Sequence, residues 1–425
     1  MASMEDIVSL CKRRGFIFQG SEIYGGLAGT WDYGPLGVTL KRNITNLWWK
    51  MFVEDRDDMF GVDAAILMNQ KVWQASGHTT GFNDPLVECS ECKTRLRQDH
   101  IENDKCPNCG KVGKFSEPRQ FNMMFKTSVG PVEDESSTSY LRPETAQGIF
   151  TNFKNVVDSI YPDFPFGMAQ VGKAFRNEIS PRDFVFRGRE FEQMEIEYFV
   201  EEKDWEADFE KWKGEFYKWF EAIGLPKSMV HELDVPESDR AHYSKKTIDF
   251  EFDFPFGKSE LYGLAYRTDF DLKNHEKSSG KKLQYTPKEG GQPFVPHVIE
   301  PTFGVDRTIL AVLVACYKED EVNGEKRSFL ALPDALAPVQ YVVSPLVKNK
   351  PELVKKAREV YGAMKKKYGA VLWDDNSNVG KRYRRADEIG VPKCITIDFD
   401  TLEDDAVTVR DRDTTKQTRV KISEL

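Results

Sequence analysis

The sequence of 425 residues lacks long hydrophobic runs, and no stretch approaches the roughly 18 apolar residues of a membrane span. Near Met1 it also lacks an apolar segment followed by a small-residue cleavage site, because MASMEDIVSLCKRRGF carries acidic side chains early. Internal repeats and long low-complexity tracts are absent as well. These absences predict a chain without a membrane partner or a secretory signal, located in the cytoplasm.

A large excess of charge is also missing. The chain has 60 Lys and Arg against 69 Asp and Glu, a net charge of −9, which argues against indiscriminate nucleic-acid binding over the whole surface. Unlike the chain as a whole, the segment 338–425 has an excess of positive charge, with 18 basic against 14 acidic residues. This asymmetry indicates a polyanionic partner for the C-terminal part.

Cysteine is scarce, and seven in a long chain without a signal segment do not suggest a disulfide framework. Four of them form two Cys-x-x-Cys pairs, CSEC and CPNC, separated by thirteen residues. Zinc takes four thiolates in a tetrahedron, and two such pairs can supply them. The spacing predicts a closed, structural Zn²⁺ site in a polar insertion at 84–118, with the ligands Cys89, Cys92, Cys106 and Cys109.

The proline-containing passage RSFLALPDALAPVQ divides the chain into two expected domains, 1–335 and 336–425. Beyond it, strand and helix patterns alternate, which predicts a small α/β domain with a mostly parallel sheet. Within the first domain, a helical and strand insertion is expected at about 201–293. Its aromatic residues Trp205, Phe209, Trp212, Phe216 and Trp219 recur at helical spacing, typical of a core-facing stripe.

The stretch AFRNEISPRDFVFRGREFEQME, from Ala174 to Glu195, predicts two antiparallel strands joined by a longer loop. Its arginines match phosphate oxygens with paired donors. Phe191 can stack on a base, and the carboxylate of Glu178 can accept from an exocyclic amine. The hairpin is therefore interpreted as a nucleoside triphosphate site; the alternative is a salt-bridged surface hairpin.

A second segment, EPTFGVDR, places Gly304 at a strand-to-helix turn and Arg307 in the first turn of an apolar helix. An arginine on a buried element is costly without a partner, and a triphosphate is a suitable one. Gly-x-x-Arg by itself is a weak signal.

Together these segments resemble a known family. FRNE and RGREFEQMEIEYF resemble motif 2 of the class II aminoacyl-tRNA synthetases, and GVDRTILAVL resembles motif 3. Four further segments are similar to the glycyl-tRNA synthetases of the homodimeric type, over nearly the whole chain: YGPLGVTLKRNITNLWW, YLRPETAQGIF, SELYGLAYRTDFDL and VIEPTFG.

The resemblance implies an α+β catalytic domain built on an antiparallel sheet (the class II synthetase fold) with the zinc-binding insertion, and a C-terminal α/β anticodon-binding domain. It implies a homodimer whose interface includes motif 1, at 38–52. The implied activity is a ligase that activates glycine with ATP and Mg²⁺ to glycyl-adenylate and transfers glycine to its tRNA.

The resemblance also assigns residues. Arg176 and Arg307 would be catalytic, holding the α- and γ-phosphates, with Glu178 on the adenine amine and Phe191 stacked on the ring. The ATP site would comprise Arg176, Asn177, Glu178, Phe186, Arg187, Gly188, Arg189, Glu190, Phe191, Glu260, Leu261, Gly304, Val305, Asp306 and Arg307. The glycine site would comprise Arg97, Glu144, Phe191, Glu192, Gln193, Met194, Glu195, Glu300, Pro301, Thr302, Phe303 and Gly304.

The chain departs from the family at Thr302, where serine is usual. Threonine keeps the hydroxyl and adds a methyl group that would tighten the pocket. In the C-terminal domain, Lys381, Arg382, Arg384 and Arg385 are expected to contact tRNA phosphates; the alternative is a solvated helix face.

Two rival interpretations remain. Another class II synthetase, for instance for serine, threonine, proline or histidine, fits less well with the acids in FEQME and EPTFG. A catalytically silent, synthetase-like binding subunit would have lost the phosphate arginines, whereas Arg176 and Arg307 are present.

Overall fold

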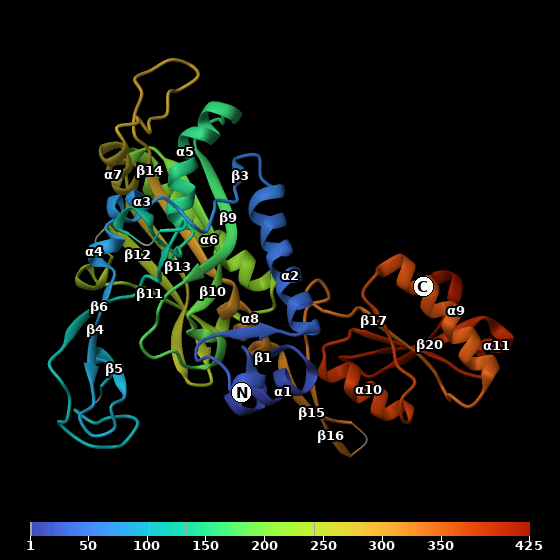
Figure 1. Ribbon diagram of the computed structural model, residues 1–425. Helices are drawn as coiled ribbons and strands as arrows, with labels where there is room; N and C mark the ends of the chain where they lie inside the picture. The colour runs from blue at the N-terminus through green and yellow to red at the C-terminus, as the bar shows by residue number, and fades with distance from the viewer. Residues whose placement is uncertain (1, 102, 133, 242, 323) are drawn as a thin grey trace.

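The computed structural model describes residues 2–101, 103–132, 134–241, 243–322 and 324–425. Its centre is a seven-stranded sheet in the order β11-β12-β13-β14-β10-β9-β3 (Figure 1), in which β3 pairs in parallel with β9 and the other pairs are antiparallel. The predicted antiparallel sheet is therefore confirmed. The strands are β3 (Met59–Gly61), β9 (Phe166–Phe175), β10 (Glu190–Val200), β11 (Val230–Asp234), β12 (Lys246–Phe254), β13 (Gly257–Thr268) and β14 (His297–Gly304).

One face of this sheet is covered by helices. Successive side chains of a strand point to opposite faces, so Met194 and Ile196 of β10 join the hydrophobic core while Glu195 and Glu197 face the other way. The core side receives α2 (Pro35–Trp49), α6 (Trp205–Ala222) and α8 (Val305–Cys316). The aromatic stripe of α6 lies in or against this core, as predicted.

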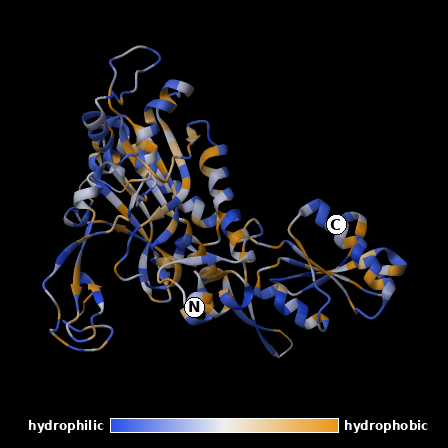
Figure 2. Ribbon diagram, in the orientation of Figure 1, coloured by the Kyte–Doolittle hydropathy of each residue, from blue (hydrophilic) through white to orange (hydrophobic). Residues whose placement is uncertain are grey.

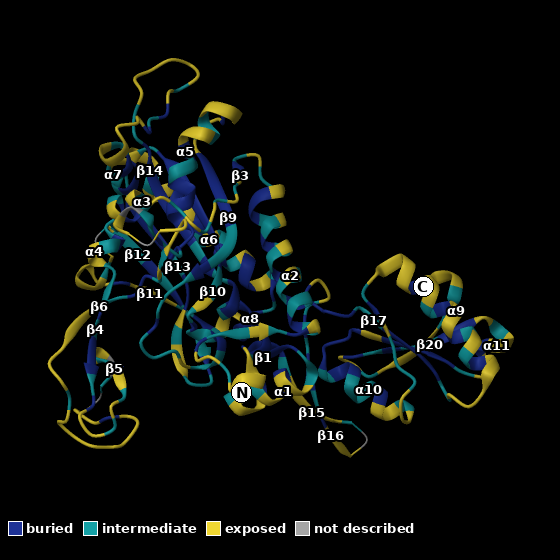
Figure 3. Ribbon diagram, in the orientation of Figure 1, coloured by how far each residue is buried: buried dark blue, intermediate teal, exposed yellow. Residues whose placement is uncertain are grey.

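The opposite face is covered only in part. A second hydrophobic cluster joins α5 (Ala146–Ile160) and α7 (Phe270–Ser279) to β9 and β10 through Phe153, Phe199 and Leu272. Figure 3 shows buried residues along the sheet and beneath these helices. Polar side chains of the central strands remain beside this cover, where a ligand can reach them.

The segment before α5 supplies smaller elements. They are α1 (Met4–Arg14), β1 (Ile17–Gln19), β2 (Trp31–Tyr33), α3 (Gln70–Ala75), α4 (His78–Gly81), β4 (Asn83–Glu88), β5 (Arg95–Arg97), β6 (Arg119–Asn122), β7 (Lys126–Ser128) and β8 (Thr138–Tyr140). Strands β5-β4-β6 form a three-stranded sheet that projects from the body, at the lower left of Figure 1. Its loops are largely polar (Figure 2).

The C-terminal part forms a separate five-stranded sheet, ordered β18-β17-β19-β20-β21. The pairs β17–β18 and β17–β19 are parallel, and β19–β20 and β20–β21 are antiparallel. The prediction of a mostly parallel sheet is therefore wrong, because the final hairpin contributes as many pairings as the crossover strands. The elements are β17 (Tyr341–Pro345), α9 (Pro351–Tyr368), β18 (Val371–Trp373), α10 (Val379–Glu388), β19 (Lys393–Ile397), α11 (Thr401–Asp404), β20 (Ala406–Asp411) and β21 (Gln417–Lys421).

A buried ionic cluster joins this part to the rest of the chain. The hairpin of β15 (Tyr317–Val322) and β16 (Glu325–Leu330) packs on α10. Arg327 of β16 lies 3.2 Å from Asp387 of α10, and Asp387 also accepts from Arg410 at 2.8 Å. All three side chains are buried.

The helices of the structure agree with the absence of long apolar runs in the sequence. Among the described residues, no helix combines the length and the apolar character that crossing a bilayer requires.

The buried ionic cluster of Arg327, Asp387 and Arg410 leads to a prediction about stability. Asp387→Ala leaves the guanidinium of Arg410 buried without its carboxylate, and Arg327 keeps its ion pair with Asp320. We therefore expect a loss of about 3–5 kcal/mol in the free energy of unfolding, measured by urea titration. The matched control is Asp158→Ala, which removes the exposed helical pair Lys154–Asp158 and should cost less than about 1 kcal/mol. Equal midpoints for the two variants would contradict the role given to the cluster.

Candidate active site

A cavity of about 480 Å³ opens on the face of the central sheet that the helices leave free. Strands β10, β12, β13 and β14 and the loop that precedes β10 line it. Many predicted site residues are among its walls: Glu144, Arg176, Glu178, Phe186, Arg187, Gly188, Phe191, Glu192, Gln193, Glu195, Glu260, Leu261, Glu300, Thr302, Gly304, Asp306 and Arg307.

Other predicted residues do not line the cavity, because they point to the opposite face of the sheet or are bonded to other residues. Met194, Phe303 and Val305 are buried in the core on the helix side of the sheet. Pro301 is buried as well. The backbone N–H of Asn177 donates to the carbonyl of Met123, Arg189 donates to the carbonyl of Ala28, and Glu190 pairs with Lys173. Arg97 belongs to the projecting sheet, where it pairs with Asp84 at 2.8 Å and Asp99 at 2.6 Å.

Arg176 directly follows β9 and is held between aromatic rings. Its guanidinium lies 5.3 Å from the centre of the Phe191 ring and 5.4 Å from that of Phe82. Its Nε donates to the carbonyl of Pro143 at 3.1 Å. Among the described residues, its Nη1 and Nη2 groups have no hydrogen-bond partner, so they can donate to an anion in the cavity.

Two charged side chains nearby have buried atoms without a partner. Among the described residues, neither Oε2 of Glu178 nor Nη1 of Arg187 has a hydrogen-bond partner. Burial lowers the pKa of Arg187, while the charge of Glu178 works in the opposite direction. Buried polar groups are normally satisfied, so an unpaired acceptor and donor facing one cavity indicate a missing polar ligand.

Arg307, in the first turn of α8, is held at the other side of the cavity. It lies 3.1 Å from the carboxylate of Glu260 and donates to the Glu260 carbonyl at 2.9 Å. Its guanidinium stacks 4.4 Å above the ring of Phe186. The charge of Arg307 keeps the pKa of Glu260 below its ordinary value.

Asp306 and Glu192 make the contacts that hold the start of β10 in place. The carboxylate of Asp306 accepts from the Tyr33 hydroxyl at 2.5 Å and from the Glu192 backbone N–H at 2.7 Å. Glu192 pairs with Lys41 at 2.6 Å. These contacts fix the start of β10 against α8.

A buried carboxylate pocket forms the inner end of the cavity. Glu195 accepts from Thr145 and, at 3.3 Å, from Thr302 on the neighbouring strand. Glu144 lies 3.4 Å from Nε2 of His78 and accepts from Gln147 at 3.0 Å. The hydroxyl of Thr302 therefore orients a carboxylate of the pocket.

Arg267 of β13 neutralises part of this pocket, and the sequence interpretation did not single it out. Its guanidinium makes a bidentate pair with Asp271, at 2.9 Å for both contacts, and donates to Glu300 at 2.8 Å. The segment YRTDFDL contains Arg267 and Asp271 four residues apart, a spacing that could have indicated the pair.

The pocket shifts the pKa values of its acids in both directions. Burial, opposed by Arg267 and reinforced by Glu195 and Glu144, raises the pKa of Glu300 to about 8. Burial and the charge of Glu144 likewise raise the pKa of Glu195. The pKa of Glu144 instead falls below its ordinary value, because His78 and Arg267 outweigh the effect of burial.

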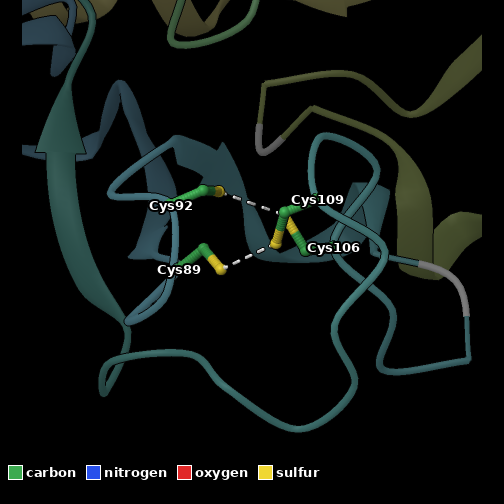
Figure 4. A group of neighbouring side chains, drawn as sticks. All are labelled: Cys89, Cys92, Cys106 and Cys109. Atoms are coloured by element: carbon green, nitrogen blue, oxygen red, sulfur yellow. Dashed lines mark hydrogen bonds between the residues drawn. The ribbon is translucent and has the colours of Figure 1, made fainter.

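The four cysteines of the projecting sheet converge (Figure 4). The Sγ atoms of Cys89 and Cys109 are 3.7 Å apart, as are those of Cys92 and Cys106. All four lie within 4.8 Å of one another. A tetrahedron with zinc–sulfur bonds of about 2.3 Å has edges of about 3.8 Å, so the thiols fit such an ion.

One of the four basic residues expected to contact phosphates on α10 differs from its expected role. Arg382 is buried and donates to backbone carbonyls of Asp375, Ser377 and Pro345, so the prediction of a phosphate contact is wrong for this residue. Arg385 pairs with Asp374 at 2.7 Å. Backbone carbonyls and a nearby aspartate provide partners that the sequence pattern did not reveal.

Two family models match the chain. Residues 125–315 match the class II core domain of tRNA synthetases for glycine, histidine, proline, serine and threonine, and residues 340–425 match an anticodon-binding domain. With the antiparallel sheet and its arginine-lined cavity, this defines a class II aminoacyl-tRNA synthetase.

Known relatives narrow the family. The chain is 49% identical to the glycine–tRNA ligase of Clostridium acetobutylicum, with 100% of this chain and 97% of the relative covered. It is 47% identical to that of Cutibacterium acnes and 46% identical to that of Thermobifida fusca, with 95% and 96% of the relatives covered. The chain belongs to the glycine–tRNA ligases.

A solved structure shares the fold. Prolyl-tRNA synthetase from Cryptosporidium parvum, complexed with halofuginone and AMPPNP, aligns with a TM-score of 0.67 and 16% identity. The alignment covers 99% of this chain and 73% of that one.

Proposed function

We propose that the chain activates glycine with ATP and transfers it to the 3′ end of its cognate tRNA. The observation that carries this proposal is one cavity with two halves of opposite character. Arginines and an unpaired carboxylate line one half, and buried carboxylates line the other. Such a cavity suits a nucleoside triphosphate beside a small ammonium compound.

In the first half, Arg176 would hold the α-phosphate and Arg307 the γ-phosphate, with Phe191 stacked on the adenine. The unpaired Oε2 of Glu178 suits the adenine amine, and the unpaired Nη1 of Arg187 suits a phosphate oxygen. The glycine carboxylate attacks the α-phosphorus and pyrophosphate leaves. Catalysis then consists of positioning and charge neutralisation, without a protein nucleophile.

A magnesium ion fits the same half. Glu260 and Asp249 line the cavity on neighbouring strands, and burial together with Glu260 and Glu251 raises the pKa of Asp249 to about 7. Carboxylates that repel one another are suitable ligands for a divalent cation. The ion would neutralise phosphate charge.

In the second half, Glu144, Glu195 and Glu300 would surround the glycine ammonium. Thr302 contributes a methyl group as well as its hydroxyl, which suits a substrate without a side chain. A larger amino acid would have to place its β-carbon against these walls.

The remaining parts would serve tRNA and assembly. We assign residues 1–335 to the catalytic domain and 336–425 to anticodon binding, acting in the cytoplasm, where tRNA is charged for protein synthesis. The homodimer is supported by apolar side chains between β1 and β2: Ile23 is 88% exposed and Tyr24 is 87% exposed. A partner subunit would cover such a patch.

The cysteine cluster would hold a structural Zn²⁺ ion. The four thiols leave no open position for a substrate, and the polar insertion around them has a small hydrophobic cluster of its own. The metal would therefore contribute to the folding of this segment.

The function is tested by amino-acid-dependent ATP–pyrophosphate exchange with all twenty amino acids. We expect exchange with glycine alone. Arg176→Ala should reduce it by about 10²–10³-fold or more, because a donor to the transition-state charge is lost. Arg182→Ala, on the same loop but exposed, is the matched control and should retain exchange. Exchange with another amino acid would overturn the glycine assignment.

The metal assignment predicts about one zinc per chain in elemental analysis of the purified protein. Chelation should lower the thermal stability of the projecting sheet, since metal binding supplies part of its folding free energy. The double variant Cys89→Ser, Cys106→Ser should contain no zinc. A zinc content well below one per chain in the unaltered protein would contradict the assignment.

The carboxylate pocket predicts a pH-dependent KM for glycine. Glu300, with its pKa near 8 in the free protein, must ionise to hold an ammonium group, so glycine binding releases a proton. The KM for glycine should therefore fall as pH rises from 6 toward 8. Glu300→Gln should give a high KM without this decline, and a flat profile in the unaltered protein would contradict the prediction.

A further inference from the structure

Glu197 lies directly behind the carboxylate pocket and has no role in the function proposed above. It is fully buried in the middle of β10, and among the described residues neither of its carboxyl oxygens has a hydrogen-bond partner. Leaving a buried charge unpaired is far more costly than leaving a neutral group unpaired. The protonation state of the Glu197 carboxyl group therefore decides how costly its burial is.

The strand register brings Glu197 against Glu300. Glu195 pairs with Thr302 and Tyr198 pairs with Ile299, so Glu197 and Glu300 are opposite each other in the β10–β14 pair. Carboxyl oxygens of Glu195, Glu197 and Glu300 all lie within 4.8 Å of one another. Like charges opposite each other destabilise a sheet, and more so when water is excluded.

Among the described residues, Arg267 is the cation whose charge acts most strongly on Glu197, while Arg142 acts on Glu195. On the other side of Glu197, β9 contributes Met168, which carries no charge. Arg267 already serves Asp271 and Glu300. The titratable and charged groups around the pocket are Glu195 on β10, Glu300 on β14, Arg267 on β13, Asp271 and His275 on α7, Arg142 and Glu144 before α5, His78 on α4, and Tyr243.

We propose that Glu197 is a positioning residue, kept as a neutral carboxylic acid whose O–H donates to the pocket carboxylates, chiefly Glu300. This inference rests on the proposed glycine site. The donated hydrogen bond fixes the Glu300 carboxylate toward the ammonium and favours its ionised form. No proton leaves Glu197 during binding; the proton released by glycine comes from Glu300.

The direction of the pKa shift agrees with this geometry. Burial, followed by the charge of Glu300, raises the pKa of Glu197 well above its ordinary value, and Arg267 only partly opposes the rise. Two interacting acids lose their protons in two separate steps. The pair can therefore hold one proton throughout the range in which Glu300 binds an ammonium group.

Two substitutions separate the possible roles of Glu197. Glu197→Gln keeps a neutral donor of the same shape, whereas Glu197→Leu fills the space without a donor. Glycine KM, ATP KM and kcat would be measured by pyrophosphate exchange from pH 6 to 9. Glu300→Gln, which lacks a carboxylate at the ammonium site itself, is the reference for loss of a direct ligand.

We expect Glu197→Gln to keep the glycine KM within about threefold of the unaltered protein. Glu197→Leu should raise it about ten- to hundredfold, the range for losing a hydrogen bond to a charged group. In Glu197→Leu, the fall of the glycine KM with rising pH should also occur at higher pH than in the unaltered protein, while the KM for ATP stays constant. If Glu197→Gln loses glycine as Glu300→Gln does, Glu197 is an ionised ligand, and the proposal is overturned.

If both variants match the unaltered protein in KM and in pH profile, Glu197 only fills space, which also overturns the proposal. Infrared spectroscopy supplies a measurement that does not depend on the leucine variant folding. At neutral pH, the carbonyl band of one protonated carboxylic acid should disappear in Glu197→Gln. Retention of the full band would contradict the neutral acid. Failure of the unaltered protein to exchange with glycine would instead refute the proposed function.

Discussion

The pocket depends on the buried guanidinium of Arg267, which lies among many acids. Arg267 holds Asp271 and Glu300 directly, and Glu144, Glu195 and Glu197 lie in the same buried region. Even together with Arg142, which acts on Glu195, Arg267 cannot neutralise all five of these carboxyl groups, so protons supply the balance in the free protein. Under the proposed function, the ammonium group of glycine replaces one such proton. Charge balance then favours a ligand with an ammonium group, and the size of the pocket selects among amino acids.

The sheet explains how this acidic pocket can lie beside a phosphate site. Residues two apart on β10 share a face, so Phe191, Gln193 and Glu195 line successive parts of one cavity. Arg176 and Arg307 reach the same cavity from the end of β9 and the start of α8. Opposite charges are thus separated along the strands, and a substrate with an ammonium group at one end and a carboxylate at the other is oriented between them.

The sequence was informative where local pattern decides structure. Alternation along FEQMEIEYF predicted the hairpin, and the CxxC spacing predicted a cluster that the four thiols form. It was uninformative where partners are distant in the chain. His78 meets Glu144 and Arg267 meets Glu300 only after the sheet has assembled. Similarly, nothing local distinguishes Arg382, satisfied by backbone carbonyls, from an exposed arginine that awaits a phosphate.

The junction between the two parts of the chain shows the same limit and has a consequence for tRNA binding. The prolines of the passage LALPDALAPVQ suggest a linker, yet Leu332, Leu336 and Ala337 within it are buried. The core of the large domain continues through them to α10, where Arg327 meets Asp387. Buried apolar side chains and a buried ion pair therefore make the junction a packed interface rather than an exposed tether. Such packing favours one separation of the cavity and the C-terminal sheet, so under the proposed function it favours an RNA that spans that separation.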